Sequence, residues 1–187
     1  MFEGDIIVKL VGNNVYLRML DVNDAEELLN FEVKNRVFFK PFTYIKDESF
    51  YTVEFQQERI KSNKEKSDND QYYFFGIYLR ETDELIGNTM LAEVLRGDLQ
   101  SCFVGYSLDE QQNGKGYTTE AVKLVVDYAF TELKLHRIEA GVMPHNIGSI
   151  RVLEKSGFHK EGIAKKNVRI NGKWEDHQVL AIINENE

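Results

Sequence analysis

The residues best suited to chemistry begin with a glycine-rich stretch, Gln111–Gly116 (QQNGKG). It follows the strand-like apolar run Cys102–Leu108 and precedes Thr118–Leu133, which has the apolar spacing of a helix. A turn before a helix N-terminus leaves backbone N–H groups free, and the helix dipole there favours an anion. Gly114 and Gly116 allow the backbone to close around a phosphate. The stretch predicts a phosphate-binding loop, with an ordinary flexible strand-to-helix turn as the alternative.

Two common nucleotide-binding motifs do not fit this loop. A Walker A sequence needs a serine or threonine after Gly-Lys, but Lys115 is followed by Gly116, and Asp109 occupies the position of the first glycine. A dinucleotide fingerprint needs a third glycine, and the chain continues after Gly116 with a tyrosine and two threonines. The loop therefore predicts a phosphate ligand of another kind.

A second polar stretch follows Pro144. Asn146 is well placed to cap a short helix over Ile150–Ser156, and Gly157 is well placed to end it. Asn146 and Ser149 are three residues apart, so an amide and a hydroxyl share one face of the first turn. Taken alone, the pair also fits an ordinary capping residue and an ordinary exposed serine.

The two stretches together resemble the GCN5-related N-acetyltransferases (GNAT). The first matches the Q-x-x-G-x-G pyrophosphate loop of that superfamily, and the second matches N-x-x-S-x-x-V-x-x-K-x-G-F-x-x-E-G over Asn146–Gly162. Further matches, from Val94–Gly97 to Trp174–His177, resemble the bacterial ribosomal-protein alanine N-acetyltransferases. The resemblance runs from about Ile86 to the C-terminus, and more loosely from Val15.

The resemblance implies acetyl-CoA as the acetyl donor and assigns roles around it. Ser149 would protonate the departing thiolate, and Asn146 would orient that serine, the pantetheine arm or the acceptor. A backbone N–H between Tyr106 and Leu108 would bind the thioester oxygen. The residues expected to bind acetyl-CoA are Tyr106, Ser107, Leu108, Gln111, Asn113, Gly114, Lys115, Gly116, Tyr117, Thr118, Asn146 and Lys155.

The general base is left open. Glu93, on the predicted strand beside the slot, is a candidate. Some relatives have a carboxylate on the strand before the last hairpin, but Val168 occupies that position here. Solvent is the alternative, because about a tenth of an α-amine with a pKa near ~8 is already neutral at neutral pH, against under about a thousandth of a lysine.

Aromatic residues early in the chain are candidates for contact with the acceptor, because two early helices and their connection wall the acceptor site in the family that the sequence resembles. These residues are Phe38, Phe39, Phe42 and Tyr44. The alternative is that they are core aromatics. Asp176 and His177, in the last predicted hairpin, are either site residues or ordinary strand residues.

The order of elements predicts one α/β domain of α+β character over residues 1–187. Its sheet is mixed, mostly antiparallel and of about seven strands, with helices on both faces. Three runs between Tyr72 and Leu108 form an antiparallel meander, and His136–Val142 should lie parallel to the last of them. Gly105 suggests a bulge that splays the neighbouring strand and opens a cofactor slot. The remaining expectations are a strand at Asn14–Leu20, helices at Asn23–Val33 and Ser49–Ser62, a hairpin of Lys165–Ile170 with Lys173–Ile183, and neither helix nor strand at Arg36–Tyr44.

Composition limits the classes of partner. The 187 residues are 42% apolar and 29% charged, with a net charge of −8. That charge argues against general nucleic-acid binding and suits an amine-bearing partner or simple solubility. The single cysteine, Cys102, forms no internal disulfide, and with four scattered histidines it makes no metal motif. The first ten residues lack an apolar leader core and no run approaches a membrane span, so we expect a cytoplasmic protein without membrane contact.

Three functions are compatible with these patterns. The first is transfer of acetyl from acetyl-CoA to the α-amine of a protein, a ribosomal protein by resemblance. The second is acetylation of a small amine, such as a polyamine or an aminoglycoside. The third is a non-catalytic acyl-CoA sensor, against which the presence of both Asn146 and Ser149 argues. No pattern indicates the oligomeric state.

Overall fold

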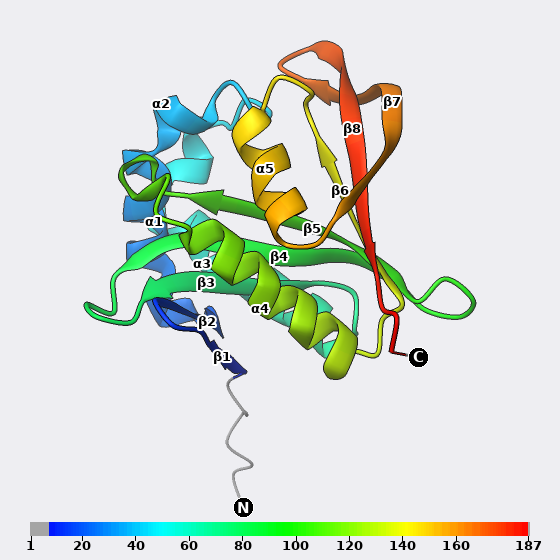
Figure 1. The fold of residues 1–187 in the computed structure, drawn as a ribbon. Coiled ribbons are helices and arrows are strands. Elements are labelled where there is room, and N and C mark those ends of the chain that lie inside the picture. Colours follow the sequence, from blue (N-terminus) through cyan, green and yellow to red (C-terminus); the bar gives the residue numbers. More distant parts are fainter. Residues whose placement is uncertain (1–7, 187) are drawn as a thin grey trace, which may run out of the picture.

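The computed structural model describes residues 8–186, and the strands in this part of the chain form one eight-stranded sheet (Figure 1). The order is β1-β2-β3-β4-β5-β6-β8-β7. The strands are β1 (Lys9–Val11), β2 (Val15–Met19), β3 (Tyr73–Leu79), β4 (Leu85–Leu95), β5 (Ser101–Leu108), β6 (Arg137–Val142), β7 (His159–Ile170) and β8 (Lys173–Ile183). The helices are α1 (Ala25–Lys34), α2 (Arg36–Phe39), α3 (Val53–Asp68), α4 (Tyr117–Thr131) and α5 (Ile147–Lys155), with 3₁₀ turns η1 (Val22–Asp24), η2 (Glu48–Tyr51) and η3 (Glu110–Gln112).

The sheet parts between β5 and β6. Within the described residues, these two strands make the one parallel pairing, and they pair only through Ser101–Phe103 and Arg137–Glu139. Beyond Phe103, β5 continues along β4, whereas β6 continues along β8 as far as Val142. The predicted mixed, mostly antiparallel sheet with a splayed slot is confirmed.

The predicted cause of the splay was wrong. Gly105 pairs with Met90 in regular register, and the register shift in β4 falls between Ala92 and Leu95. Glu93 lies in that bulge with a φ of 53°. Beyond their short parallel pairing, β5 stays with β4 and β6 stays with β8, which a bulge signal in one strand does not reveal.

Several element boundaries also differ from those predicted. The edge strand β1 was not predicted, and Arg36–Phe39 forms a one-turn helix where neither helix nor strand was expected. Both are too short to leave a periodic pattern. β7 begins at His159 rather than at the predicted Lys165. Its first residues were missed because nearly all residues of this strand are exposed and no apolar alternation marks it. α3 continues to Asp68 instead of ending near Ser62.

Helices cover both faces of the sheet, as predicted (Figure 1). α4 and α5 bury Val122, Val125 and Leu153 completely on one face. α1 and α3 bury Leu28 and Ile60 on the other. Full burial of such a side chain contributes about 1.5–3 kcal/mol. The first turns of α4 and α5 are thereby held beside the parted strands.

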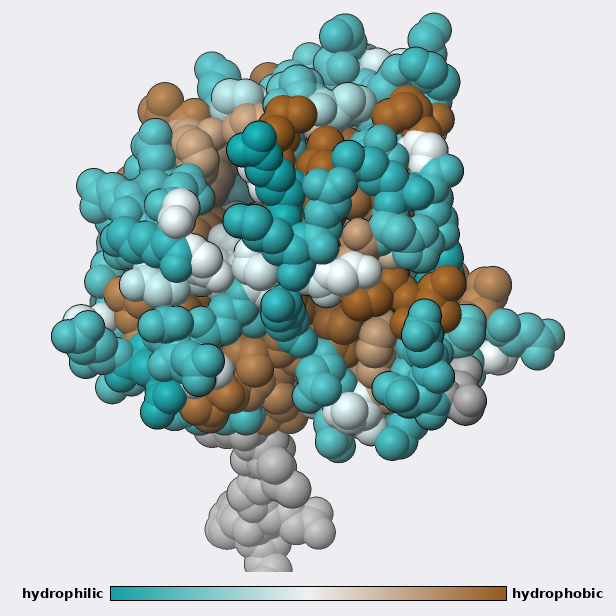
Figure 2. Space-filling view, viewed as in Figure 1, coloured by the Kyte–Doolittle hydropathy of each residue, from teal (hydrophilic) through white to brown (hydrophobic). Residues whose placement is uncertain are grey.

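The surface seen in Figure 2 is largely hydrophilic and is hollowed between α2 and α5. Among the helices of residues 8–186, none combines the length and apolar character that crossing a membrane requires. The expectation that the chain has no leader rests partly on residues 1–7, which lie outside the described residues.

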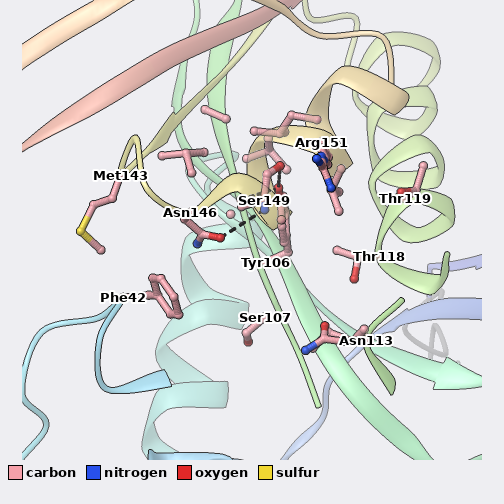
Figure 3. A pocket seen from close by; sticks show the side chains of 18 of the residues that line it. Phe42, Tyr106, Ser107, Asn113, Thr118, Thr119, Met143, Asn146, Ser149 and Arg151 are labelled. Atoms are coloured by element: carbon pink, nitrogen blue, oxygen red, sulfur yellow. Dashed lines mark hydrogen bonds between the residues drawn. The ribbon is translucent and has the colours of Figure 1, made fainter. Parts of the chain in front are cut away.

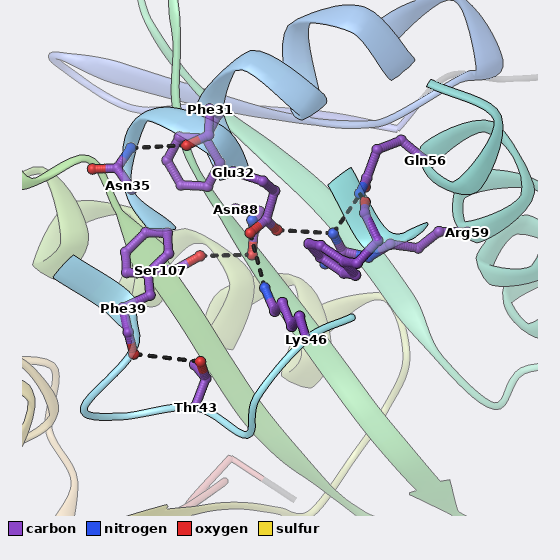
Figure 4. Close-up of polar contacts among 11 residues, drawn as sticks. Phe31, Glu32, Asn35, Phe39, Thr43, Lys46, Gln56, Arg59, Asn88 and Ser107 are labelled. Atoms are coloured by element: carbon purple, nitrogen blue, oxygen red, sulfur yellow. Dashed lines mark hydrogen bonds and ion pairs between the residues drawn. The ribbon is translucent and has the colours of Figure 1, made fainter. Parts of the chain in front are cut away.

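A buried ion cluster ties the segment after α2 to α1 and α3 (Figure 4). Glu32 is 3% exposed. Its carboxylate accepts hydrogen bonds from Lys46 Nζ and Arg59 Nη1, each at 2.9 Å. Burial lowers the pKa of Lys46, and the Glu32 charge opposes that shift. The cluster holds residues 40–47 against the helical layer.

Substitution of Glu32 should therefore destabilise the fold. Glu32→Ala leaves two largely buried cations without their carboxylate, and we expect the free energy of unfolding to fall by about 3 kcal/mol. The matched control is Glu48→Ala, which breaks the ion pair of Arg36 with a glutamate side chain that is 80% exposed. The control should leave the urea midpoint nearly unchanged. Equal losses in the two variants would contradict a structural role for the buried cluster.

Candidate active site

A cavity of about 640 Å³ opens where β5 and β6 part. Its walls come from the ends of these two strands, the loop before α4, the first turns of α4 and α5, and α2 with the residues that follow it (Figure 3). Both polar stretches singled out in the sequence therefore face one cavity, although they lie some thirty residues apart in the chain.

The glycine-rich loop adopts the conformation that its glycines allow. Gly114 has a φ of 79° and Gly116 a φ of 85°. A Cβ on either residue would meet no atom within 4 Å, so backbone conformation rather than crowding requires glycine. Gly116 is the N-cap residue of α4, and as a glycine it supplies no side chain to cap the first turn of the helix. Its first N–H groups are therefore available to an anion at this end of the cavity.

The start of the loop is anchored to α1. The Asp109 carboxylate, buried beneath the loop, accepts from the backbone N–H of Gln111 at 2.9 Å and pairs with Lys34 Nζ at 2.5 Å. The Asn35 side chain accepts from the backbone N–H of Glu110 at 3.0 Å. These contacts fix where the loop leaves β5.

The cavity is lined by most, but not all, of the predicted loop residues. Those that line it are Asn113, Gly114, Gly116, Tyr117 and Thr118. Gln111 and Lys115 do not: Lys115 is exposed and donates from Nζ to Gln112 Oε1 at 2.8 Å, and Gln112 lines the cavity instead. The η3 turn accounts for Gln112 lining the cavity in place of Gln111, because successive side chains in a 3₁₀ turn point about 120° apart. The sequence motif did not show that turn.

The end of β5 forms the floor of the cavity. Tyr106, Ser107 and Leu108, which the sequence analysis expects to bind the cofactor, all line it. Beyond Phe103, the edge of β5 that faces β6 pairs with no strand among residues 8–186. Ser107 Oγ donates to Asn88 Oδ1 at 3.1 Å, which fixes its hydroxyl. Backbone groups on this open edge are therefore left to contact a ligand.

Asn146 and Ser149 lie together at the start of α5, which begins at Ile147 rather than Ile150 (Figure 3). The Asn146 side chain caps the helix by accepting from the backbone N–H of Ser149 at 3.2 Å. Ser149 Oγ lies 2.8 Å from Tyr106 Oη. Burial raises the pKa of Tyr106 to about 12, and the Ser149 hydrogen bond offsets part of that rise. The spacing of Asn146 and Ser149 predicted their shared turn, but nothing predicted Tyr106 as the serine's partner.

The ionic side chains that line the cavity are basic. Arg151 and Lys155 lie four residues apart on one face of α5, and His177 lines the cavity from β8. No Asp or Glu is among the lining residues in the described part of the chain. Sequence reasoning named Lys155 and missed Arg151, which the same helical spacing from Lys155 would have indicated. The α5 end of the cavity suits an anion.

The structure does not place the predicted base in the cavity. Glu93 is exposed in the β4 bulge and is not a lining residue. Val168 is 40% exposed and lies in β7, outside the cavity. The Asp176 carboxylate is also outside, where it accepts from Lys165 Nζ at 2.8 Å. Glu93 is therefore not retained as a candidate base.

Aromatic side chains of the α2 segment wall the other end of the cavity. Phe38, Phe39 and Phe42 line it, together with Thr43, which the sequence analysis did not name. Tyr44 is 63% exposed and does not line the cavity. The end of the cavity at the α2 segment is thus largely apolar and aromatic, in contrast to the basic α5 end.

Comparison with known proteins identifies the family of this fold and site. The model of the acetyltransferase (GNAT) domain matches residues 14–159. The chain therefore belongs to the GNAT family of acetyltransferases, and the enzyme class that the two motifs predicted is confirmed.

Relatives that match nearly the whole chain support its membership of the GNAT family. The probable N-acetyltransferase YjcK of Bacillus subtilis is 59% identical over 175 residues, which cover 94% of this chain and 97% of the relative. The crystal structure of the ribosomal-protein-S5-alanine acetyltransferase of Vibrio fischeri superposes with a TM-score of 0.91 at 32% identity, covering 96% of this chain and 98% of the other. Mycobacterium smegmatis RimJ, solved with CoA-disulfide, gives 0.88 at 28% identity, covering 96% and 87%.

Proposed function

We propose that the protein transfers acetyl from acetyl-CoA to the free α-amine at the N-terminus of a protein. The observation that carries this proposal is the charge of the cavity lining, which within residues 8–186 contains Arg151 and Lys155 and no carboxylate. Polyamines and aminoglycosides carry several ammonium groups, and burying them without carboxylates would be costly. A protein α-amine brings one amine, whose pKa near ~8 leaves about a tenth of it neutral at neutral pH.

Residues around the glycine-rich loop fit the phosphates of acetyl-CoA, the acetyl donor of the reaction. The uncapped N–H groups at the start of α4 would bind the pyrophosphate, and Gly114 and Gly116 would let it approach. Arg151 and Lys155 add positive charge at this end of the cavity. In our proposal Gln111 and Lys115 support the loop without lining the site.

The acetyl thioester supplies an activated acyl group and a thiol leaving group, and residues beside the parted strands would act on both. An N–H on the open edge of β5, between Tyr106 and Leu108, would bind the developing oxyanion. The amine nitrogen bonds to the carbonyl carbon and the C–S bond breaks. Ser149 Oγ gives its proton to the departing sulfur and regains one from water, while the amine loses its proton to water.

Asn146 would hold this serine in place by capping the turn that carries it. Among residues 8–186, no carboxylate lines the cavity to act as a base. Solvent therefore takes the amine proton in our proposal, which suits an acceptor that is already partly neutral. The similarity to the Vibrio fischeri ribosomal-protein-S5-alanine acetyltransferase supports a ribosomal-protein N-terminus as the acceptor.

Mass spectrometry of acetylated products tests the acceptor class. The protein is incubated with acetyl-CoA and peptides that have a free N-terminus, the same peptides with a blocked N-terminus and a free lysine, spermidine, and kanamycin. We expect one acetyl group on the free α-amine and none on the blocked peptides. Faster acetylation of spermidine or kanamycin than of every peptide would contradict the proposal.

Substitutions in the loop test the cofactor site. Gly114→Val and Gly116→Val force a β-branched residue into a left-handed conformation and should weaken acetyl-CoA binding strongly in calorimetry. The matched control is Gly97→Val, since Gly97 has a φ of 67° in the β4–β5 turn and a Cβ there also meets no atom within 4 Å. The control imposes a similar strain and should keep wild-type affinity. Unchanged affinity in both loop variants would disprove the assignment.

Loss of the Ser149 hydroxyl should slow the chemical step. Ser149→Ala is expected to lower kcat on the order of 10²–10⁴-fold while acetyl-CoA affinity changes little, because proton donation acts in the transition state. Ser156→Ala is the matched control on α5: its Oγ donates to Val152 O at 2.8 Å and it does not line the cavity. Single-turnover rates at saturating acetyl-CoA measure the effect. Wild-type turnover in Ser149→Ala would exclude the serine as the acid.

A further inference from the structure

The Tyr106 phenol and the Ser149 hydroxyl meet across the slot, one from β5 and one from α5 (Figure 3). Tyr106 Oη lies 2.8 Å from Ser149 Oγ and 3.1 Å from the backbone oxygen of Ser149. Both side chains line the cavity. The serine hydroxyl therefore already has a partner before any ligand enters, and the direction of its proton depends on that partner.

Each hydroxyl carries one proton, so two arrangements are possible. If Tyr106 donates to the Ser149 backbone oxygen, Ser149 Oγ must donate to Tyr106 Oη, and its proton is occupied by that hydrogen bond. If Tyr106 donates to Ser149 Oγ, the serine proton is free. Only the second arrangement lets Ser149 donate to a departing sulfur.

We propose that Tyr106 is a positioning residue for acetyl transfer: its phenol donates to Ser149 Oγ and leaves the serine proton free for the sulfur. This inference rests on the proposed role of Ser149. As that proton moves to sulfur, negative charge develops on Ser149 Oγ, and the hydrogen bond from Tyr106 becomes charge-assisted and stronger. Tyr106 thus stabilises the transition state more than the bound ground state.

The surroundings of Tyr106 keep it a donor. Burial raises its pKa to about 12, so the phenol remains protonated throughout the pH range in which an α-amine reacts. The Asn146 side chain accepts a 3.2 Å hydrogen bond from the backbone N–H of Ser149, which holds the serine in position next to Tyr106. The pair is therefore fixed from both sides, by β5 and by the cap of α5.

A purely structural role is the competing explanation. The contact between Tyr106 Oη and the Ser149 backbone oxygen joins β5 to α5 whether or not the serine hydroxyl acts. A structural role predicts that removing the phenol oxygen weakens the fold or cofactor binding. It also predicts the same effect whether residue 149 is serine or alanine. A role through Ser149 Oγ predicts that the effect depends on that oxygen.

A double-mutant cycle separates the two explanations. Tyr106→Phe, Ser149→Ala and the double variant are assayed by single-turnover acetyl transfer, with whichever amine the wild-type enzyme acetylates fastest. We expect Tyr106→Phe to lower kcat on the order of 10- to 100-fold, with the KM for acetyl-CoA within about twofold of wild type. The double variant should be no slower than Ser149→Ala, because Tyr106 acts only through the serine.

Tyr73→Phe is the matched control. It also removes a phenol hydroxyl, which donates to Asp70 Oδ1 at 2.7 Å, but Tyr73 does not line the cavity. It should keep wild-type kcat. Unchanged kcat in Tyr106→Phe, a further loss in the double variant, or a loss confined to acetyl-CoA affinity would each overturn the inference. The double-mutant cycle uses whichever amine the wild-type enzyme acetylates fastest, so its result does not depend on the proposed acceptor class. An error in that class would instead show in the mass-spectrometry comparison of peptides, spermidine and kanamycin.

Discussion

The parting of β5 from β6 is the constraint on which the site depends. The two strands share a short parallel pairing, Ser101–Phe103 with Arg137–Glu139, and then each follows its own antiparallel neighbour. β6 hydrogen-bonds to β8 along its whole length, whereas beyond Phe103 β5 is paired only with β4 among the described strands. The result is a cavity with an open strand edge on one side and the first turn of α5 on the other. A flat, continuous sheet would bury the same residues and leave no room for a thioester.

Charge distinguishes the two ends of this cavity. The chain has a net charge of −8, yet the ionic groups that line the cavity are basic. Arg151 and Lys155 lie at the α5 end near the uncapped start of α4, where an anion is favoured by the helix dipole as well. The α2 end is walled by phenylalanines. A phosphate-bearing donor and an amine acceptor can therefore approach from different ends.

Parts of the site could be predicted from the sequence where a backbone conformation requires a particular residue type. Gly114 and Gly116 indicated a loop with positive φ, and Asn146 indicated a helix cap, because local geometry alone demands those residue types. The meander and the crossover followed from apolar periodicity. The orientation of side chains within the loop was not predictable, because it depends on the η3 turn and its anchor at Asp109.

Contacts between distant segments were also beyond prediction. Tyr106 and Ser149 are 43 residues apart, and only the packing of α5 over β5 brings their hydroxyls together. The place of Glu93 on a strand was predicted correctly, but it lies in the bulge of β4 and does not line the cavity. Sequence motifs thus indicated which chemistry is present, and the sheet determined which side chains take part in it.

The central claim is that the slot places the sulfur of the donor beside the Ser149–Tyr106 pair. A crystal structure of the protein with bound coenzyme A tests this claim most directly. We expect the sulfur within hydrogen-bond distance of Ser149 Oγ, with Tyr106 Oη on the opposite side of that oxygen. A pantetheine arm that follows another path, with its sulfur out of reach of Ser149 while the phosphates occupy the loop, would contradict the account.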